Sequence, residues 1–240
     1  MKQRTFSIIG KKEGFENETC GTLFFEIERI LREKRPKAFM LENVRNLTAH
    51  DKGKTFQIIR KHLEALGYNV YAKVLNALDY GVPQKRERII IVGFKDDVMF
   101  TFPEPIPVSK RKKLIDVLET DVDEKYYVKD NIRQSRLMRL KDPNYPKPYI
   151  SHENMAGSIT PHPYSSCLRA GASANYILIN DERRPTEREM LRLQGFPDDF
   201  KIVVSYGHIK HQTGNSVAVP VISAVAKQMI SSLKQYELNK

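Results

Sequence analysis

The 240-residue sequence has few cysteines and no long uninterrupted apolar run. Its two cysteines, Cys20 and Cys167, exclude a disulfide framework and a zinc site made of cysteines alone, and they suit a reducing compartment. The longest apolar stretch, residues 217–226, is far shorter than the about 20 residues that span a bilayer. The first apolar run stops at Gly10, which does not fit a secretory signal peptide. The sequence therefore predicts a cytoplasmic protein that does not insert into a membrane.

A metal site is not expected either, because the six histidines lack the spacing of a ligand set. His208 and His211 are three residues apart, but no third ligand accompanies them. What the sequence has in excess is positive charge, since 40 Lys and Arg against 29 Asp and Glu give a formal net charge of +11. This charge favours a polyanionic partner, most often nucleic acid, although a positive surface also serves solubility alone.

The first hundred residues alternate between helix and strand patterns. The signals are apolar helical faces, β-branched runs and stops at proline or glycine. The predicted elements are a helix at 21–35, a buried parallel strand at 38–41, a helix at 54–66, a strand at 68–75 and a buried strand at 89–94. The apolar face of the first helix consists of Leu23, Phe24, Ile27, Ile30 and Leu31. Helices interleaved with buried strands are typical of an α/β layered domain.

The pattern changes after residue 103. Three prolines within residues 103–107 fit a linker, and residues 108–180 have weak periodicity and basic clusters such as residues 110–113. Helix signals return at Thr186 and again over residues 218–236. The sequence thus predicts a loop-rich second region that is followed by two helices.

Glu42 and Asn43 stand directly after the predicted strand at 38–41. In open α/β sheets that end of a strand faces the ligand crevice, where apolar surroundings can tune a carboxyl group for proton exchange. A turn that caps the next segment explains the same two residues. The residues by themselves leave both interpretations open.

Two further clusters can hold anions or base edges. Arg86 and Arg88 are two positions apart, so in an extended chain they share a face and can hold a phosphate, a carboxylate or a base edge. Gly214, Asn215 and Ser216 precede the last apolar helix, whose N-terminus favours an anionic group. A solvated charge cluster and an ordinary helix cap are the alternative interpretations.

Taken in order, these segments resemble the bacterial cytosine-5 DNA methyltransferases of restriction–modification systems. Each motif is weak alone, but five in this order and spacing are specific. The matching segments are residues 6–15 with the helix start at 21–24, residues 42–44, residues 84–88, residues 184–200 and residues 214–217. The resemblance covers nearly the whole chain.

The resemblance implies an enzyme that flips a cytosine out of duplex DNA and moves a methyl group from S-adenosylmethionine to its carbon 5. A cysteine thiolate would add to carbon 6 of the base. Glu42 would hold ring nitrogen 3 and the exocyclic amine, Arg88 would contact the base carbonyl, and Arg86 would support the site and the nearby backbone. Asn215 and Ser216 would lie near the cofactor.

The resemblance also implies an α/β fold, with a partial Rossmann-like methyltransferase domain and a smaller loop-rich target-recognition domain. Residues 1–108 would belong to the catalytic domain, residues 109–212 to the recognition domain, and residues 213–240 to a helix that returns to the first. The expected partner is double-stranded DNA, and the residues expected to contact it are Ser7, Lys11, Arg169, Gly171 and Ser173. Arg169 is the best candidate for a guanine contact, with a phosphate contact as the equal alternative.

The sequence departs from the family pattern at its beginning. Gln3 stands where the nucleophilic cysteine is expected, and glutamine cannot form the covalent adduct. Neither Cys20 nor Cys167 lies at the nucleophile's place, and most of the S-adenosylmethionine site would lie outside the matched segments. Three interpretations follow: one half of a split methyltransferase that a second polypeptide completes, a shortened and inactive product, or a non-catalytic DNA-recognition module. In the first two, the strand at 38–41 would form an exposed sheet edge.

Overall fold

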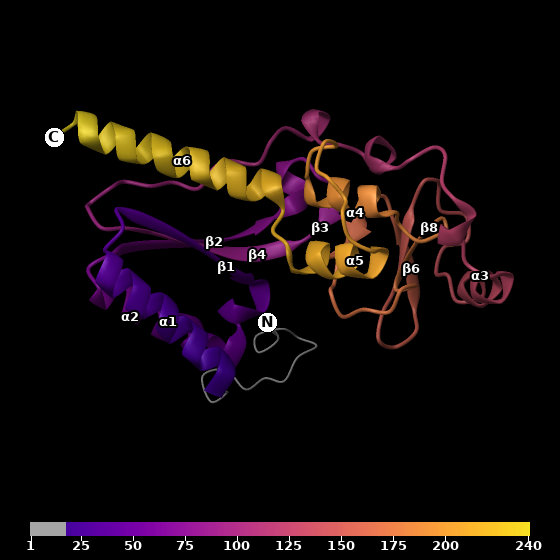
Figure 1. Ribbon diagram of the computed structural model, residues 1–240, viewed down its shortest axis with the longest axis horizontal. Coiled ribbons are helices and arrows are strands. Elements are labelled where there is room, and N and C mark those ends of the chain that lie inside the picture. Colours follow the sequence, from indigo (N-terminus) through magenta and orange to yellow (C-terminus); the bar gives the residue numbers. More distant parts are fainter. Residues whose placement is uncertain (1–17) are drawn as a thin grey trace. The chain divides into compact units, whose positions relative to one another are not determined.

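The computed structural model describes residues 18–240, with side chains from residue 23 onward. These residues form two compact units, each made of several chain segments. The first unit takes the chain up to residue 75, residues 87–103 and residues 225–240, and the second takes residues 76–86 and 104–224 (Figure 1). We predicted boundaries at residues 108 and 212 between a catalytic and a recognition domain. The two units do not test those roles, so these boundaries stay a prediction.

The first unit is built on a three-stranded sheet in the order β1-β4-β2. Strand β1 (Ala38–Val44) pairs antiparallel with β4 (Glu87–Phe94), and β2 (Asn69–Asn76) follows on the other side of β4. The predicted strands at 68–75 and 89–94 are confirmed. The parallel pairing predicted for residues 38–41 is wrong, because the described partner of this strand, β4, is antiparallel to it. An apolar run carries no information on strand direction.

Strand β1 lies at the end of the sheet that the structure describes, and Phe39 is its one buried residue. Strand β4, by contrast, is buried along its last six residues, as expected of its β-branched run in the middle of the sheet. The two strands therefore differ in environment, because one has a partner on each side and the other has a described partner on one side only.

Helices cover both faces of this sheet (Figure 1). Helices α1 (Glu18–Lys34) and α2 (Lys54–Ala65) lie on one face, and the part of α6 (Val219–Leu238) that belongs to the first unit lies along the other. The core under α1 and α2 consists of Phe24, Leu31, Phe39, Leu47, Ile59, Leu63, Tyr68, Val70, Ile89 and Ile91. The predicted burial of Ile30 is wrong, because α1 buries a narrow stripe and leaves Ile30 48% exposed.

Local sequence signals explain where α1 and α2 end. Pro36 follows α1 by two residues, and the residue before a proline is biased against helical backbone. Gly67 follows α2 with a φ of +84°, a left-handed conformation that glycine adopts without a Cβ penalty. The sequence predicted both ends within one residue.

The second unit is rich in loops and short elements, as predicted. Strand β5 (Ile150–Glu153) lies between β6 (Ile159–His162) and β8 (Ile177–Ile179) and is antiparallel to both. A separate short pair joins β3 (Gln84–Lys85) to β7 (Ser165–Ser166) in parallel. The helices that lie wholly within this unit are α3 (Asp130–Leu137), α4 (Glu187–Gln194) and α5 (Tyr206–Asn215). The 3₁₀ turns within residues 18–240 are η2 (Arg45–Thr48), η3 (His50–Gly53), η4 (Ala77–Tyr80), η5 (Val108–Lys110), η6 (Leu114–Val117) and η7 (Glu124–Tyr126).

A buried ionic network holds α3 against the β5-β8 part of the second unit. The guanidinium of Arg136, 1% exposed, donates from Nε to Asp181 Oδ1 at 2.9 Å and from Nη2 to Ser151 Oγ at 2.7 Å. Its Nη1 donates to the backbone oxygen of Asn175 at 3.0 Å. Because Asp181 is fully buried, each of these charges depends on the other for its solvation.

The last two helices are separated at Ser216. Gly214 and Asn215 end α5, and α6 begins at Val219, so the Gly-Asn-Ser turn is first of all the C-terminal end of a helix. Taken together, residues 206–238 are long and apolar enough to cross a membrane, with a mean hydropathy of 1.4 and 28% burial in the most apolar window. Core helices of globular proteins meet the same test, so length and composition here decide nothing on their own.

Candidate functional site

The carboxylate of Glu42 and the guanidinium of Arg88 form an ion pair in the first unit. Glu42 lies on β1 and Arg88 on β4, and the register places Val44 opposite Arg88, so Glu42 is its diagonal neighbour. The Arg88 Nε lies 2.8 Å from Glu42 Oε1. The two side chains remain 21% and 18% exposed, which leaves both within reach of a ligand.

Neighbouring bonds orient this pair. Arg88 also donates from Nη1 to the backbone oxygen of Glu87 at 2.9 Å. The side chain of Glu87 in turn accepts from Arg45 Nη1 at 2.9 and 3.0 Å. Glu42 and Arg88 thus combine an acceptor and a planar donor at one place, the two features that are needed to bind a group with both donors and acceptors on one edge.

Arg86 makes its contacts inside the second unit and is 3% exposed. Its Nη1 donates to Cys167 Sγ at 3.1 Å and to the Leu168 backbone oxygen at 3.3 Å. Its Nη2 donates to the backbone oxygens of Gly214, at 3.4 Å, and Ser216. The guanidinium therefore ties the 167–168 segment to the end of α5.

Gln84 adds a second tie to the same segment. Its amide accepts from the Leu168 backbone nitrogen at 3.0 Å and donates to the Leu193 backbone oxygen at 2.8 Å. The side chain is fully buried. Gln84 and Arg86 thus both position the backbone that leads into Arg169.

Gly214 packs directly against that backbone. A Cβ built on Gly214 would lie 2.2 Å from the Ala170 nitrogen and 2.6 Å from the Arg169 carbonyl carbon. Both are main-chain atoms, so no side-chain rotation could make room. This close approach of two backbones is the reason that a residue without a side chain is needed there.

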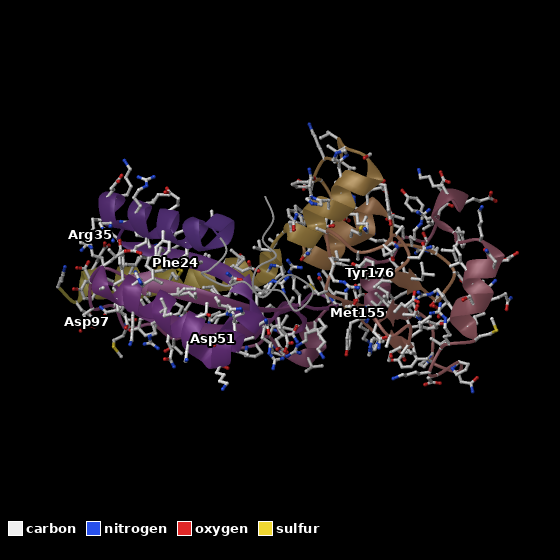
Figure 2. The ribbon with its side chains drawn as sticks, turned by 90° about the horizontal axis from the view of Figure 1, so that it is seen from below. Phe24, Arg35, Asp51, Asp97, Met155 and Tyr176 are labelled. Atoms are coloured by element: carbon white, nitrogen blue, oxygen red, sulfur yellow. The ribbon has the colours of Figure 1, made fainter. Side chains whose placement is uncertain are left out.

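The segment after Cys167 places Arg169 over an aromatic ring. The guanidinium carbon of Arg169 lies 4.8 Å from the ring centre of Tyr176, and the Arg169 backbone nitrogen donates to the Tyr176 hydroxyl at 3.0 Å. Tyr176 lies among the side chains of the second unit in Figure 2. Gly171 and Ser173 are exposed in the same segment. The three described residues that we predicted to contact DNA thus lie on one segment, and their contact with DNA stays a prediction.

Asn215 and Ser216 offer limited means of holding S-adenosylmethionine. Asn215 is exposed, with its amide nitrogen 3.4 Å from His211 Nδ1. The Ser216 hydroxyl donates to the Val217 backbone oxygen at 3.0 Å, and its carbonyl accepts from Arg86. A nucleoside cofactor needs apolar cover for its base and partners for its ribose, which one exposed amide does not supply. These two residues on their own do not fit the whole cofactor.

Of the other predicted site residues, Gln3, Ser7 and Lys11 lie outside the described residues, and so does the side chain of Cys20. Cys167 is half-buried, and its sulfur lies 3.5 Å from the Leu168 backbone oxygen. Across the described side chains, no group of three or more His, Cys, Asp and Glu residues could hold a metal ion.

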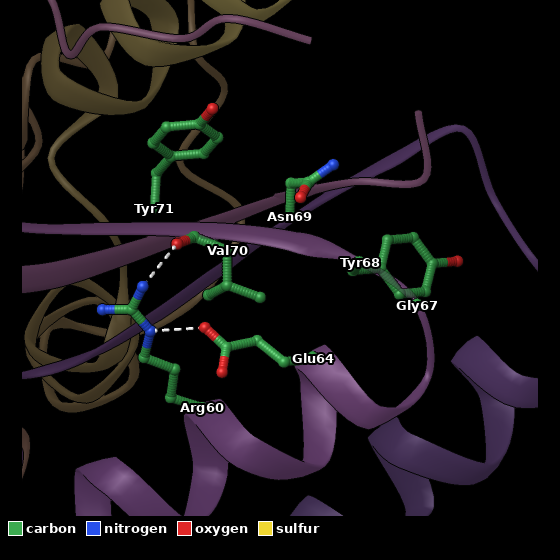
Figure 3. Close-up of a pocket in the computed structure, with 7 residues that line it drawn as sticks. All are labelled: Arg60, Glu64, Gly67, Tyr68, Asn69, Val70 and Tyr71. Carbon is green, nitrogen blue, oxygen red and sulfur yellow. Dashed lines mark hydrogen bonds and ion pairs between the residues drawn. The ribbon is translucent and has the colours of Figure 1, made fainter. Parts of the chain in front are cut away.

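A polar hollow of about 500 Å³ lies elsewhere in the first unit, beside α2 and β2 (Figure 3). Across it, Arg60 Nε bonds to Glu64 at 2.7 Å and Arg60 Nη2 donates to the Val70 backbone oxygen at 3.4 Å. The lining residues are Arg60, Glu64, Gly67, Tyr68, Asn69, Val70 and Tyr71. The hollow includes none of the predicted site residues, and its ionic groups bond to each other.

A family model of the C-5 cytosine-specific DNA methylases matches residues 4–231. The chain belongs to this family. The match runs through both units and includes every site residue described above, so the Glu42–Arg88 pair and the Arg86 contacts are features of a cytosine-5 DNA methylase chain. Members of this family use S-adenosylmethionine.

Curated methylases are similar over most of the chain. The type II methyltransferase M.NgoBI of Neisseria gonorrhoeae is 55% identical over 224 residues, which are 92% of this chain and 69% of that protein. M.HaeII of Haemophilus aegyptius is 53% identical, over 95% of this chain and 71% of that protein. M.HhaI of Haemophilus parahaemolyticus is 36% identical, over 96% of this chain and 74% of that protein. The resemblance predicted from the motifs is therefore confirmed.

Solved methyltransferase structures share the fold at low sequence identity. The Dnmt2 methyltransferase of S. pombe superposes with a TM-score of 0.67 at 19% identity, covering 92% of this chain and 76% of its own. The EhMeth methyltransferase of Entamoeba histolytica gives 0.61 at 16% identity, covering 90% and 74%. The predicted α/β methyltransferase fold is confirmed.

Sequence reasoning missed several contacts of this methylase chain. It did not single out Gln84 or Gly214 as positioning residues, although both stand inside motifs that it named. It also did not place Tyr176 under Arg169. The sequence shows only that Arg169 and Tyr176 are seven positions apart. This spacing predicts no contact unless the conformation of the residues between them is known.

Proposed function

We propose that this chain acts in cytosine-5 methylation of duplex DNA, with Glu42 and Arg88 holding the Watson–Crick edge of a flipped cytosine. The single observation that carries the proposal is the 2.8 Å pair between these two side chains, partly exposed on neighbouring strands. Glu42 would accept from the exocyclic amine and from a proton on ring nitrogen 3. Arg88 would donate to the base carbonyl.

The ion pair suits this task because it keeps both groups ordered before the base arrives. A cytosine presents a donor, a ring nitrogen and an acceptor along one edge. When it binds, Glu42 and Arg88 can exchange their bond to each other for bonds to the base. Holding a proton at ring nitrogen 3 withdraws electrons from the ring and favours attack of a thiolate at carbon 6. The attack itself requires a thiolate at the base.

Cys167 does not suit the role of that nucleophile. Its sulfur accepts from the buried Arg86, whose other bonds hold main-chain oxygens, so the thiol is part of a positioning contact. We propose that residues 18–240 hold the base and contact DNA while another segment or polypeptide supplies the thiolate. A non-catalytic DNA-binding module is the second candidate function, and the net charge of +11 favours it equally.

The decisive experiment is methyl transfer from tritiated S-adenosylmethionine to mixed-sequence duplex DNA, together with calorimetric titration of the cofactor. Absence of both binding and transfer supports a chain that requires a partner. Cofactor binding without transfer supports the DNA-binding module. Transfer by the chain alone would contradict our assignment of the nucleophile, and Cys20 and Cys167 would then be replaced in turn by serine.

The role of Glu42 is tested in whichever preparation transfers methyl groups. Glu42→Gln should lower the rate by about 100-fold or more, because a neutral amide cannot hold a proton at ring nitrogen 3 in the same way. DNA affinity should change little. Glu64→Gln is the matched control, since it also removes a carboxylate of the first unit that pairs with an arginine, but away from the site. An equal loss of rate and affinity in Glu42→Gln would contradict the proposed role.

The basic segment at residues 110–113 is proposed to contact DNA phosphates. Each phosphate contact that is lost should reduce the slope of log affinity against log salt by about 0.9. Replacing Lys110, Lys112 and Lys113 with glutamine should therefore weaken binding and flatten its salt dependence. Arg111 is left in place because it bonds to Asp79 at 2.8 Å. An unchanged slope would remove this segment from the DNA interface.

A further inference from the structure

Two histidines lie on the same face of the three-stranded sheet in the second unit. On β5, His152 stands opposite Thr160 of β6, and His162 of β6 stands opposite Ile150. Residues two apart along a strand share a face, so both imidazoles are on the face that carries Ile150. Ile150 is fully buried in the core, whereas both histidines are half-buried at its margin.

Aromatic contacts connect this margin to the segment that carries Arg169. The ring of His152 meets that of Tyr176 edge-on with centroids 6.5 Å apart, and Arg169 lies over the same tyrosine ring. The ring of His162 is stacked on Tyr164 at 5.1 Å, with an angle of 9° between the planes. We call His152, His162, Tyr164 and Arg169 the histidine strip.

The charges around the strip are mostly positive. Burial lowers the pKa of His152, and Arg169, His162 and Arg136 lower it further, while Glu153 acts in the opposite direction. Glu153 is the next residue along β5, so it points to the other face, and Arg136 and Arg139 bond to it there.

His162 experiences the same kind of environment. Burial lowers the pKa of His162, and the exposed Lys85 on β3 adds to the effect. The lowered pKa values favour the neutral form of both imidazoles, and a neutral imidazole presents one N–H donor and one nitrogen acceptor.

We propose that the histidine strip contacts base edges of duplex DNA and contributes to the choice of target sequence. The proposal rests on the proposed function, which brings duplex DNA to the chain. The occupant is argued from charge, because the strip contains Arg169 and lies near Lys85, and both cations attract a polyanion. Neutral donor–acceptor rings suit base edges, whose pattern of donors and acceptors differs from one base pair to the next.

The test is selection of bound sequences from a random duplex library by the full chain, with wild type, His152→Ala and His162→Ala in parallel. Wild type is expected to enrich a defined site. Each variant is expected to lose about tenfold of its selectivity at one or two positions of that site, the usual effect of a mismatched base pair. The slope of affinity against salt should stay as in wild type, because no phosphate contact is removed.

His208→Ala is the matched control. His208 is an exposed histidine on α5 of the same unit, with Nδ1 2.8 Å from Ser205 Oγ. It should enrich the wild-type site with wild-type selectivity. If an alanine variant has a lowered Tm, the glutamine variant at the same position, His152→Gln or His162→Gln, is used instead. The glutamine amide keeps a donor and an acceptor but holds them at other positions than the imidazole does. The selectivity of the glutamine variants should also change.

Two results would overturn the proposal, and they differ in what else they affect. If wild type enriches a site and every histidine variant enriches the same site with the same selectivity, the strip does not read bases, and the proposed function stands. If wild type enriches no sequence and binds no duplex, the proposed function fails and the strip proposal fails with it.

Discussion

Replacing Gly214 with alanine should destabilise the folded chain and also displace the backbone of residues 169 and 170. The added methyl would lie 2.2 to 2.7 Å from three main-chain atoms of residues 169 and 170, well inside van der Waals contact. Overpacking of this kind costs about 1–3 kcal/mol, and main-chain atoms that cannot rotate away place this site at the upper end. For a chain of this size, that lowers Tm by roughly 2–4 °C per kcal/mol.

Gly207 provides the matched control on the same helix. A Cβ at Gly207 meets nothing within 4 Å, so Gly207→Ala adds helix propensity without a clash and should stabilise by up to about 1 kcal/mol. Urea denaturation followed by circular dichroism measures both variants, and tyrosine emission adds a second signal because the chain has no tryptophan. If Gly214→Ala were as stable as Gly207→Ala, the close packing of α5 against residues 169–170 would be refuted.

Two further predictions concern the second unit. Arg136→Ala should lower the free energy of unfolding by about 3–5 kcal/mol, because it leaves the buried Asp181 without its cation. Arg133→Ala removes only an exposed ion pair and should lower it by less than about 1 kcal/mol. Urea titration measures both variants, and equal losses would contradict the buried network. His152 and His162 have pKa values below the ordinary 6.5, so the folded state binds fewer protons than the unfolded state. Their contribution to stability is complete above pH 6.5 and is lost as pH falls through the lowered values. His162→Gln should flatten this loss between pH 7 and 5, and an unchanged pH profile would contradict it.

Much of the first unit could be predicted because its signals are local. The apolar periodicity of α2, the proline after α1 and the β-branched run of β4 each fix one element without reference to the others. The antiparallel direction of β1 could not be predicted, because direction depends on the path of the chain between strands. The exposure of Ile30 was missed for a similar reason, since the width of a buried helical stripe is set by its neighbours.

The candidate site divides in the same way. Glu42 and Arg88 could be found from their positions beside strands, but their 2.8 Å contact required the register of β1 on β4. Arg86 and Arg88 were predicted to share a face and to hold one group. In the structure each makes its contacts within a different unit, because the chain passes from one unit to the other between residues 86 and 87. Spacing in sequence could not show this change.

The contacts of Gln84 and Arg86 are made largely to peptide groups. Leu168 contributes its nitrogen and oxygen, and Gly214 and Ser216 contribute their oxygens, so these bonds do not depend on which side chains the partners carry. Side chains at residues 171–175 can therefore be exchanged while these main-chain bonds stay the same. On the proposed function, substitutions in this one short segment would change the DNA sequence preference without loss of the fold that supports it.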